Sequence, residues 1–182
     1  DASYSLMNDR PISPVASFIP EQSVYITSLS KSLAPGLQIG YASVPISVKS
    51  SISRALSNLN VSISPLMAEL SARLIVSGQI DIIIREHKDK TKERNELFNR
   101  YFPSNIYRGN ENSIFRWLHL KGSIKGSYFE QAALDKGVQV YAAERFAVGN
   151  TAAERAVRVA ICAPESVEEL EAGLKILHDI MK

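Results

Sequence analysis

The sequence has little of the residues that build metal centres and covalent cross-links. It contains one cysteine, Cys162, and three histidines among 182 residues. One cysteine cannot form an internal disulfide, and these few residues make no plausible zinc ligand set. Apolar runs long enough to span a membrane are also missing. These absences predict a protein of a reducing, cytoplasmic compartment with no membrane partner and no metal.

The sequence also lacks a large net charge. The chain has 21 Lys and Arg against 19 Asp and Glu, a net charge of +2. This balance produces no strong field for nucleic acid or acidic membranes. Hydrophobic residues make up 45% and charged residues 22%, as in ordinary globular proteins. Because the sequence opens on Asp1, we expect it to be the C-terminal piece of a longer protein.

The most informative feature that is present is Lys31, in the run Ser28-Leu29-Ser30-Lys31. It follows a stretch rich in β-branched residues and hydroxyls and precedes a Pro-Gly turn and a second apolar stretch. A primary amine is thereby presented at the end of a strand, with hydroxyls beside it that suit a phosphate. This is the arrangement needed to bind the aldehyde of pyridoxal 5'-phosphate.

Apolar periodicity predicts two strands and then two helices in the first hundred residues. The strands are Ser23 to Leu29 and Leu37 to Val44. After a polar loop, Asn58 to Ser64, a proline at the first helical position predicts a helix from Pro65 to a C-cap at Gly78. A second helix is predicted from Gln79 to Tyr101.

Two helical faces carry further predictions. Leu66, Leu70 and Leu74 repeat every four residues and predict one apolar face. The run from Arg85 to Arg94 is heavily charged, with opposite charges at helical spacing. We interpret it as a solvated helix face, with a nucleic-acid contact as the alternative.

From Pro103 onward the pattern changes to short strands alternating with helices, typical of a small α+β unit. Trp117, within an apolar strand pattern, is expected in the core. The predicted elements are strands at Ile114 to Leu120, Val138 to Tyr141 and Ala156 to Cys162, a helix opened by the capping box Ser127-x-x-Glu130 and closed at Gly137, and a final helix opened by the box Ser166-x-x-Glu169 with the stripe Val167, Leu170, Leu174 and Leu177.

Several residues together resemble a known family. Asp1-Ala2-Ser3-Tyr4 is followed by Ser28-x-Ser30-Lys31 and then by Ala-Pro-Gly-Leu-x-Ile-Gly-Tyr. This order resembles the fold-type I aminotransferases, which use pyridoxal 5'-phosphate. The resemblance implies an α/β fold: a partial large domain of the fold-type I aminotransferase plus a C-terminal small α+β domain.

The resemblance also implies roles for individual residues. Lys31 bonds to the cofactor aldehyde, Asp1 pairs with the ring nitrogen, and Tyr4 contacts the ring hydroxyl. Ser28, and by its position Ser30, holds the phosphate. Where the family usually has an arginine that clamps the phosphate, this chain has Gln38, a neutral amide.

The substrate-binding residue implied by the resemblance is Arg158, in the run Val157-Arg158-Val159. In an extended strand, Arg158 shares a face with two alanines, Ala156 and Ala160, which leave it room to grip a carboxylate. Arg155 is a weaker candidate, and a structural ion pair is the alternative role for Arg158.

Within the family, the chain is most similar to the MocR-type GntR regulators, on the runs Ser64 to Leu70, Phe115 to Leu118 and Ala163 to Ser166. This likeness implies a sensor of an amino acid or vitamin B6 effector, a homodimer of the full-length protein, and DNA contact only through an N-terminal domain missing here. The implied domains are a large-domain remnant over 1–60, connecting helices over 61–102, and the small domain over 103–182.

Two alternatives stay open. One is a working aminotransferase that acts on an amino acid, and the other is a structural domain that has lost the cofactor. Because the family's ring-stacking aromatic residue lies upstream of Asp1, we expect these 182 residues alone to bind cofactor weakly and not to turn over substrate.

Overall fold

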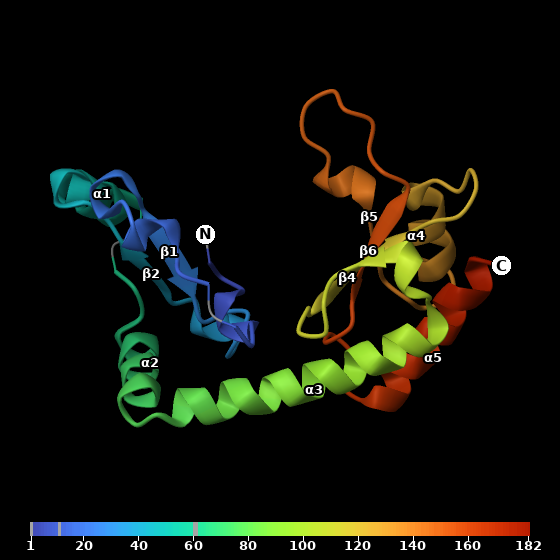
Figure 1. Cartoon of the computed structure of the whole chain (residues 1–182), viewed down its shortest axis with the longest axis horizontal. Helices are drawn as coiled ribbons and strands as arrows, with labels where there is room; N and C mark the ends of the chain where they lie inside the picture. The colour runs from blue at the N-terminus through green and yellow to red at the C-terminus, as the bar shows by residue number, and fades with distance from the viewer. Residues whose placement is uncertain (1, 11, 60–61) are drawn as a thin grey trace. The chain divides into compact units, whose positions relative to one another are not determined.

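The structure is a computed structural model that describes residues 2–10, 12–59 and 62–182. It contains two compact units, Asp1–Lys88 and Asp89–Lys182. The long helix α3, Gln79–Tyr101, begins in the first unit and ends in the second (Figure 1). Its observed bounds match the predicted ones, because the apolar spacing and a preceding glycine with φ of 72° mark its start.

The first unit contains a two-stranded antiparallel sheet and helices. Strand β1 pairs with β2 so that Tyr25 faces Ser43 and Ser28 faces Gly40. The chain turns between them through a short 3-10 segment, Pro35–Leu37. The elements are β1 (Tyr25–Ser28), β2 (Gly40–Ser43), α1 (Ile46–Leu59), α2 (Pro65–Val76) and the start of α3.

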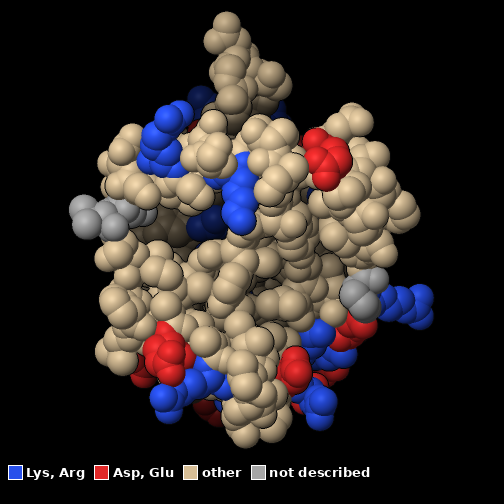
Figure 2. Space-filling view, turned by 90° about the vertical axis from the view of Figure 1, so that its left-hand side faces the viewer, with Lys and Arg blue, Asp and Glu red and all other residues tan. Residues whose placement is uncertain are grey.

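The core of the first unit is small. Its buried cluster joins the loop between the strands to the first turns of α3, through Leu29, Leu37, Ile39, Ile80 and Ile84. Helix α1 has no buried residue, and the predicted apolar face of α2 is largely exposed, with Leu66 at 69% and Leu70 at 41%. Figure 2 shows one face of the molecule, where uncharged residues cover most of the surface and charged residues are scattered.

The second unit is a four-stranded antiparallel sheet with three helical segments on one face. The strand order is β3-β4-β6-β5, so the two longest strands lie in the middle. The elements are β3 (Tyr107–Arg108), β4 (Phe115–His119), α4 (Gly126–Leu134), β5 (Tyr141–Ala142), β6 (Ala156–Ala160) and α5 (Val167–Ile180).

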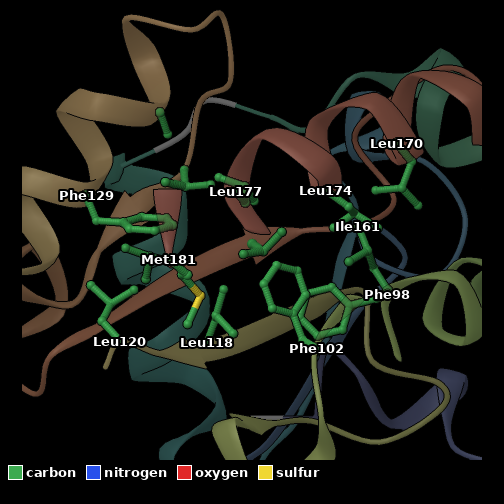
Figure 3. Close-up of a cluster of buried hydrophobic side chains, with 14 of the residues drawn as sticks. Phe98, Phe102, Leu118, Leu120, Phe129, Ile161, Leu170, Leu174, Leu177 and Met181 are labelled. Atoms are coloured by element: carbon green, nitrogen blue, oxygen red, sulfur yellow. The ribbon is translucent and has the colours of Figure 1, made fainter. Parts of the chain in front are cut away.

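The core of the second unit lies between this sheet and the helices. Figure 3 shows Phe98 of α3, Phe102 directly after it, Leu118 of β4, and Leu174 and Leu177 of α5 gathered together. All five side chains are at most 1% exposed. Complete burial of side chains this large contributes about 1.5–3 kcal/mol each, so this cluster dominates the stability of the unit.

The helix starts of the second unit confirm one predicted capping box and overturn the other. At α5, the Ser166 hydroxyl accepts from the Glu169 N–H at 3.1 Å, as predicted. At α4, Lys125 is the N-cap and contributes no side-chain hydrogen bond, so the predicted box at Ser127 is wrong. The physical reason is that Glu130 binds the Ala142 N–H and Arg145 instead.

Other differences are local. The predicted loop from Asn58 begins inside α1, a helix that the sequence pattern did not reveal. Strand β5 begins at Tyr141 rather than at Val138, and β1 and β2 are shorter than predicted. Trp117 is half-buried on the sheet face away from the helices, so its predicted place in the core is wrong. Its neighbour Arg116, at 2% exposed, takes the inward position instead.

Candidate functional site

Lys31 lies in a tight turn directly after β1. The turn is closed by two backbone hydrogen bonds to the Leu29 carbonyl oxygen, from the Leu33 N–H at 2.8 Å and the Ala34 N–H at 3.2 Å. Lys31 is exposed, whereas Leu29 on one side and Ser32 on the other are buried. The turn therefore presents the amine outward while its own backbone is anchored beneath.

Helix α3 supplies that anchor. His87 donates from Nδ1–H to the Ser32 carbonyl oxygen at 2.9 Å, and Ile84 packs in the same cluster as Leu29. A lone histidine in a charged run carries no sequence signal for such a role. His87 is thus a positioning residue for the lysine turn that sequence reasoning missed.

The hydroxyls predicted to hold a phosphate flank the lysine. Ser28 ends β1 opposite Gly40, and Ser30 lies within the turn; both are half-buried. The Ser32 hydroxyl is fully buried and has no hydrogen-bond partner among the described residues. Buried hydroxyls usually have a partner, so this donor stands out beside Lys31.

Gln38 has a left-handed backbone conformation. Its φ of 51° and ψ of 32° end the short 3-10 segment Pro35–Leu37, and among the described residues no other non-glycine has a positive φ. Such a conformation costs a non-glycine residue about 1 kcal/mol or more and is frequent at functional sites. The exposed amide of Gln38 therefore occupies a strained position after the lysine turn.

Of the N-terminal pair, Asp1 lies outside the described residues. Tyr4 is 49% exposed. The segment before it runs beside β1, because the Ala2 N–H donates to the Ile26 carbonyl at 2.7 Å and the Thr27 hydroxyl donates to the Ala2 carbonyl at 3.3 Å. Tyr4 lines a surface hollow with Val24 and Tyr25. Lys31 is not among the described residues of that hollow.

Arg158 belongs to the second unit, on the open face of β6. The neighbouring residues of the strand, Val157 and Val159, point into the core at 0% and 5% exposed, which confirms the predicted alternation. The Arg158 guanidinium lies over the rings of Phe115 at 4.4 Å and Phe146 at 4.7 Å. Sequence reasoning missed these rings, since they come from separate segments.

Arg155, the weaker candidate, forms a hydrogen bond with the backbone. It donates to the Gly122 carbonyl oxygen at 2.6 Å. Two cations in the charged half of α3 form hydrogen bonds within the fold. Lys88 donates to the Asn8 carbonyl. Arg94 donates to the carbonyls of Ile161, Pro164 and Glu165, which lie between β6 and α5. Most charged residues of the run are exposed, which fits the predicted solvated face, whereas Lys88 and Arg94 pack against neighbouring carbonyls.

In the described part of the chain, no group of three or more His, Cys, Asp or Glu is arranged to hold a metal ion. Over the same residues, none of the helices combines the length and apolarity needed to cross a bilayer.

The donor set around Lys31 fits pyridoxal 5'-phosphate. It combines an exposed primary amine, two half-buried hydroxyls, one buried hydroxyl without a partner and a neutral amide in a left-handed turn. An aldehyde needs the amine, and phosphate oxygens need hydrogen-bond donors of this kind. The predicted set contains no cationic phosphate ligand, since Gln38 is a neutral amide.

Comparison with solved structures identifies the fold. The chain superposes on the α-aminoadipate aminotransferase LysN of Thermus thermophilus with a TM-score of 0.81, and on an archaeal alanine:glyoxylate aminotransferase with a TM-score of 0.86. The chain has the aminotransferase fold. The predicted α/β class is thereby confirmed, although the sequence identities are only 19% and 17%.

The aminotransferase fold is present here in part. All of the chain aligns, but it covers 48% and 46% of those two structures. An aromatic aminotransferase of Pyrococcus horikoshii gives a similar result, with a TM-score of 0.85 and 49% of that structure covered.

In sequence, the chain is similar to a regulator. It is 54% identical over 181 residues to the uncharacterized HTH-type transcriptional regulator YdeF of Bacillus subtilis strain 168. The alignment takes in the whole chain but 39% of the length of YdeF. No protein-family model matches the sequence.

Proposed function

We propose that this chain is the effector-sensing, pyridoxal 5'-phosphate-binding part of a MocR-type regulator of the GntR family. The observation that carries the proposal is the 54% identity to an HTH-type transcriptional regulator in a chain with the aminotransferase fold. Neither feature alone points to a sensor. Together they support an aminotransferase-like domain that serves regulation.

The residues have separate roles in this proposal. Pyridoxal 5'-phosphate supplies, when bound, an aldehyde that captures amines and a ring that withdraws electrons. Lys31 would hold the cofactor through its amine, and Ser28, Ser30 and Gln38 would donate hydrogen bonds to the phosphate. The turn of Lys31 is kept in place from below by His87.

Three further residues have roles in this proposal. Asp1 would pair with the ring nitrogen, Tyr4 would contact the ring hydroxyl, and Arg158 would bind the effector carboxylate. Gln38 donates hydrogen bonds to phosphate without the charge of an arginine. A neutral amide binds phosphate less tightly than a guanidinium, which suits a sensor more than an efficient enzyme.

We extend the proposal to the domain organisation of the full-length protein. Residues 1–60 belong to a large cofactor-binding domain, 61–102 connect, and 103–182 form the small domain. The full-length protein is a cytoplasmic homodimer that contacts DNA through another domain. Effector capture shifts the population of that dimer between two conformations.

The first experiment tests the lysine. In the full-length protein that contains this chain, we expect the visible absorbance of lysine-bound cofactor, and its loss in Lys31→Ala. Lys49→Ala is the matched control, because Lys49 is an exposed lysine of the same unit in α1. Equal absorbance in Lys31→Ala and the wild type would refute the cofactor role.

The second experiment separates a regulator from an enzyme. We expect an amino acid to change the affinity of the full-length protein for its own promoter DNA, with slow or no conversion to the oxo acid. The alternative, an aminotransferase that acts on an amino acid, is supported by the fold and predicts rapid conversion with no DNA effect. Arg158→Gln should weaken the response to the amino acid by about tenfold or more, since a charge-assisted pair contributes about 1.5–3 kcal/mol.

A further inference from the structure

The open face of the second sheet carries an aromatic cluster around Arg158. The register pairs Arg158 with Trp117 on one side and with Tyr141 on the other. Directly paired residues of antiparallel strands lie on the same face, so these three side chains form a row. Phe146, from the segment after β5, packs against Trp117 with ring centroids 5.6 Å apart.

Arg158 is held in this cluster by rings rather than by an acid. Its guanidinium carbon lies 4.4 Å from the centroid of the Phe115 ring, 4.7 Å from that of Phe146 and 5.3 Å from that of Tyr141. Its Nε is buried and without a hydrogen-bond partner in the described part of the chain. Rings attract a cation but accept no strong hydrogen bond, so the N–H groups keep their capacity for a carboxylate.

A second arginine at the same ring provides an internal contrast. The guanidinium carbon of Arg145 lies 5.5 Å from the centroid of the Tyr141 ring. It is already bonded to the Glu130 carboxylate, through Nε at 2.9 Å and Nη2 at 2.5 Å. The charge of Arg145 is therefore compensated within the fold. The charge of Arg158 has no carboxylate partner among the described residues.

The walls around Arg158 disfavour a second acidic group. Trp117 donates from its indole N–H to Glu154 at 2.9 Å, which fixes a negative charge beside the row. Of the cations nearby, Arg145 is paired with Glu130 and His119 lies 3.9 Å from Glu154, while Arg155 donates one N–H to the Gly122 carbonyl. A ligand with two carboxylates would place one of them against rings or against Glu154.

We propose that Arg158, Phe115, Tyr141 and Phe146 select an amino acid effector with one carboxylate and an apolar side chain, and reject dicarboxylates. Arg158 binds the carboxylate, and the rings contact the apolar part. The proposal rests on the proposed function, because it takes Arg158 as the carboxylate-binding residue. It adds the chemical class of the effector and the residues that determine it.

The chain contains a reporter for this test, because its one tryptophan, Trp117, lies in the row. The full-length protein is titrated with L-leucine, L-phenylalanine, L-glutamate and leucinol, and tryptophan fluorescence is recorded. A Trp117→Phe variant identifies the part of the signal that comes from this site. We expect leucine and phenylalanine to bind about tenfold or more tightly than glutamate, the discrimination typical of an apolar pocket. Leucinol, which lacks the carboxylate, should not bind.

Variants of Phe146 test whether this ring determines the preference for leucine over glutamate. In Phe146→Leu we expect the preference for leucine over glutamate to fall several-fold, and Phe146→Tyr should restore it. Tyr128→Leu is the matched control, an aromatic residue of the same unit that is 69% exposed and lies in α4. A purely structural role of Phe146 would lower both affinities equally and leave the ratio unchanged, which would overturn its part in selection.

The two proposals fail in distinguishable ways. Visible absorbance of lysine-bound cofactor together with equal affinity for leucine and glutamate would overturn the selectivity and leave the proposed function intact. Selective quenching of Trp117 by leucine without that absorbance would overturn the cofactor role and support the selective site. Failure of every amino acid to bind, by fluorescence and by calorimetry, would overturn the selectivity as well.

Discussion

The two units of this chain differ sharply in how they bury apolar side chains. The second unit has one cluster of fifteen buried hydrophobic residues, and the first has a cluster of five. Of the large hydrophobic residues that are exposed in the described chain, nineteen lie in the first unit and four in the second. The first unit therefore leaves uncovered much of the apolar surface that a stable domain buries.

The two main candidate residues, Lys31 and Arg158, lie in different units. Lys31 belongs to the weakly packed unit, where one short turn is supported by a small cluster and by His87. Arg158 belongs to the central strand of the well-packed unit. Exposed apolar surface of this extent marks regions that contact other protein surface. We therefore expect the geometry of the lysine turn to be easier to perturb than that of Arg158.

The largest effect is expected in the core of the second unit. Phe98→Ala removes a side chain that is 0% exposed and should lower the free energy of unfolding by about 3–5 kcal/mol. Urea denaturation followed by circular dichroism measures it. The control is Tyr128→Ala, a 69% exposed aromatic residue, expected to change stability by less than about 0.5 kcal/mol. Similar losses in the two variants would contradict the assigned core.

A smaller and local effect is expected in the first unit. Ile84→Ala should cost about 2 kcal/mol, at the low end for such a change, because the small cluster under the lysine turn can partly close the space. Hydrogen exchange should show faster exchange of β1 and β2 amides, with β4 and β6 unchanged. Equal acceleration in all four strands would mean that the two units unfold as one. That result would contradict the proposed difference in stability between them.

The smallest effect concerns pH and the ion pair of the second unit. The hydrogen bond from Arg145 lowers the pKa of Glu130, and the Ala142 N–H lowers it further. A folded-state pKa below the unfolded value stabilises the fold above the usual carboxyl range. That stability is lost as pH falls through the folded pKa. Glu130→Gln should therefore cost about 1 kcal/mol at neutral pH, discounted for the exposed Arg145.

The difference between Glu130→Gln and the wild type should vanish in acid, as measured by thermal unfolding across pH. Glu93→Gln serves as the control, since Glu93 is an exposed carboxylate on α3 in the same unit. A difference that persists unchanged at low pH would show that lost packing, rather than the charge of Glu130, explains the cost.

The elements that sequence reasoning predicted well have local causes. Pro65 at the first turn of α2, the Ser166 cap of α5 and the glycine before α3 all act within a few residues. Helix α1 was missed because its serine-rich sequence has weak helix propensity and it has no buried residue to set a clear apolar face. Its existence depends on surroundings that no local pattern describes.

The misplacement of Trp117 has a different cause. A strand with apolar residues on both faces does not reveal which face is the core. In Phe115-Arg116-Trp117-Leu118, the charged residue points inward, where Arg116 donates to the Gly109 carbonyl and lies over the Tyr107 ring at 4.6 Å. Burial lowers the pKa of the Arg116 guanidinium. Only the packing of neighbouring segments explains why such a residue is inside.

By itself the sequence determined the class of fold, the limits of α3, the start of α5, and the run of serines and lysine expected to bind a cofactor, because these depend on periodicity, caps and motif spacing. The tertiary structure alone decided that His87 supports the lysine turn, that Glu130 serves Arg145 instead of a helix cap, and that three rings surround Arg158. Each of these contacts joins residues that are distant in the chain or lie on different elements. Which such groups meet is set by the packing of whole elements, and local sequence does not encode it.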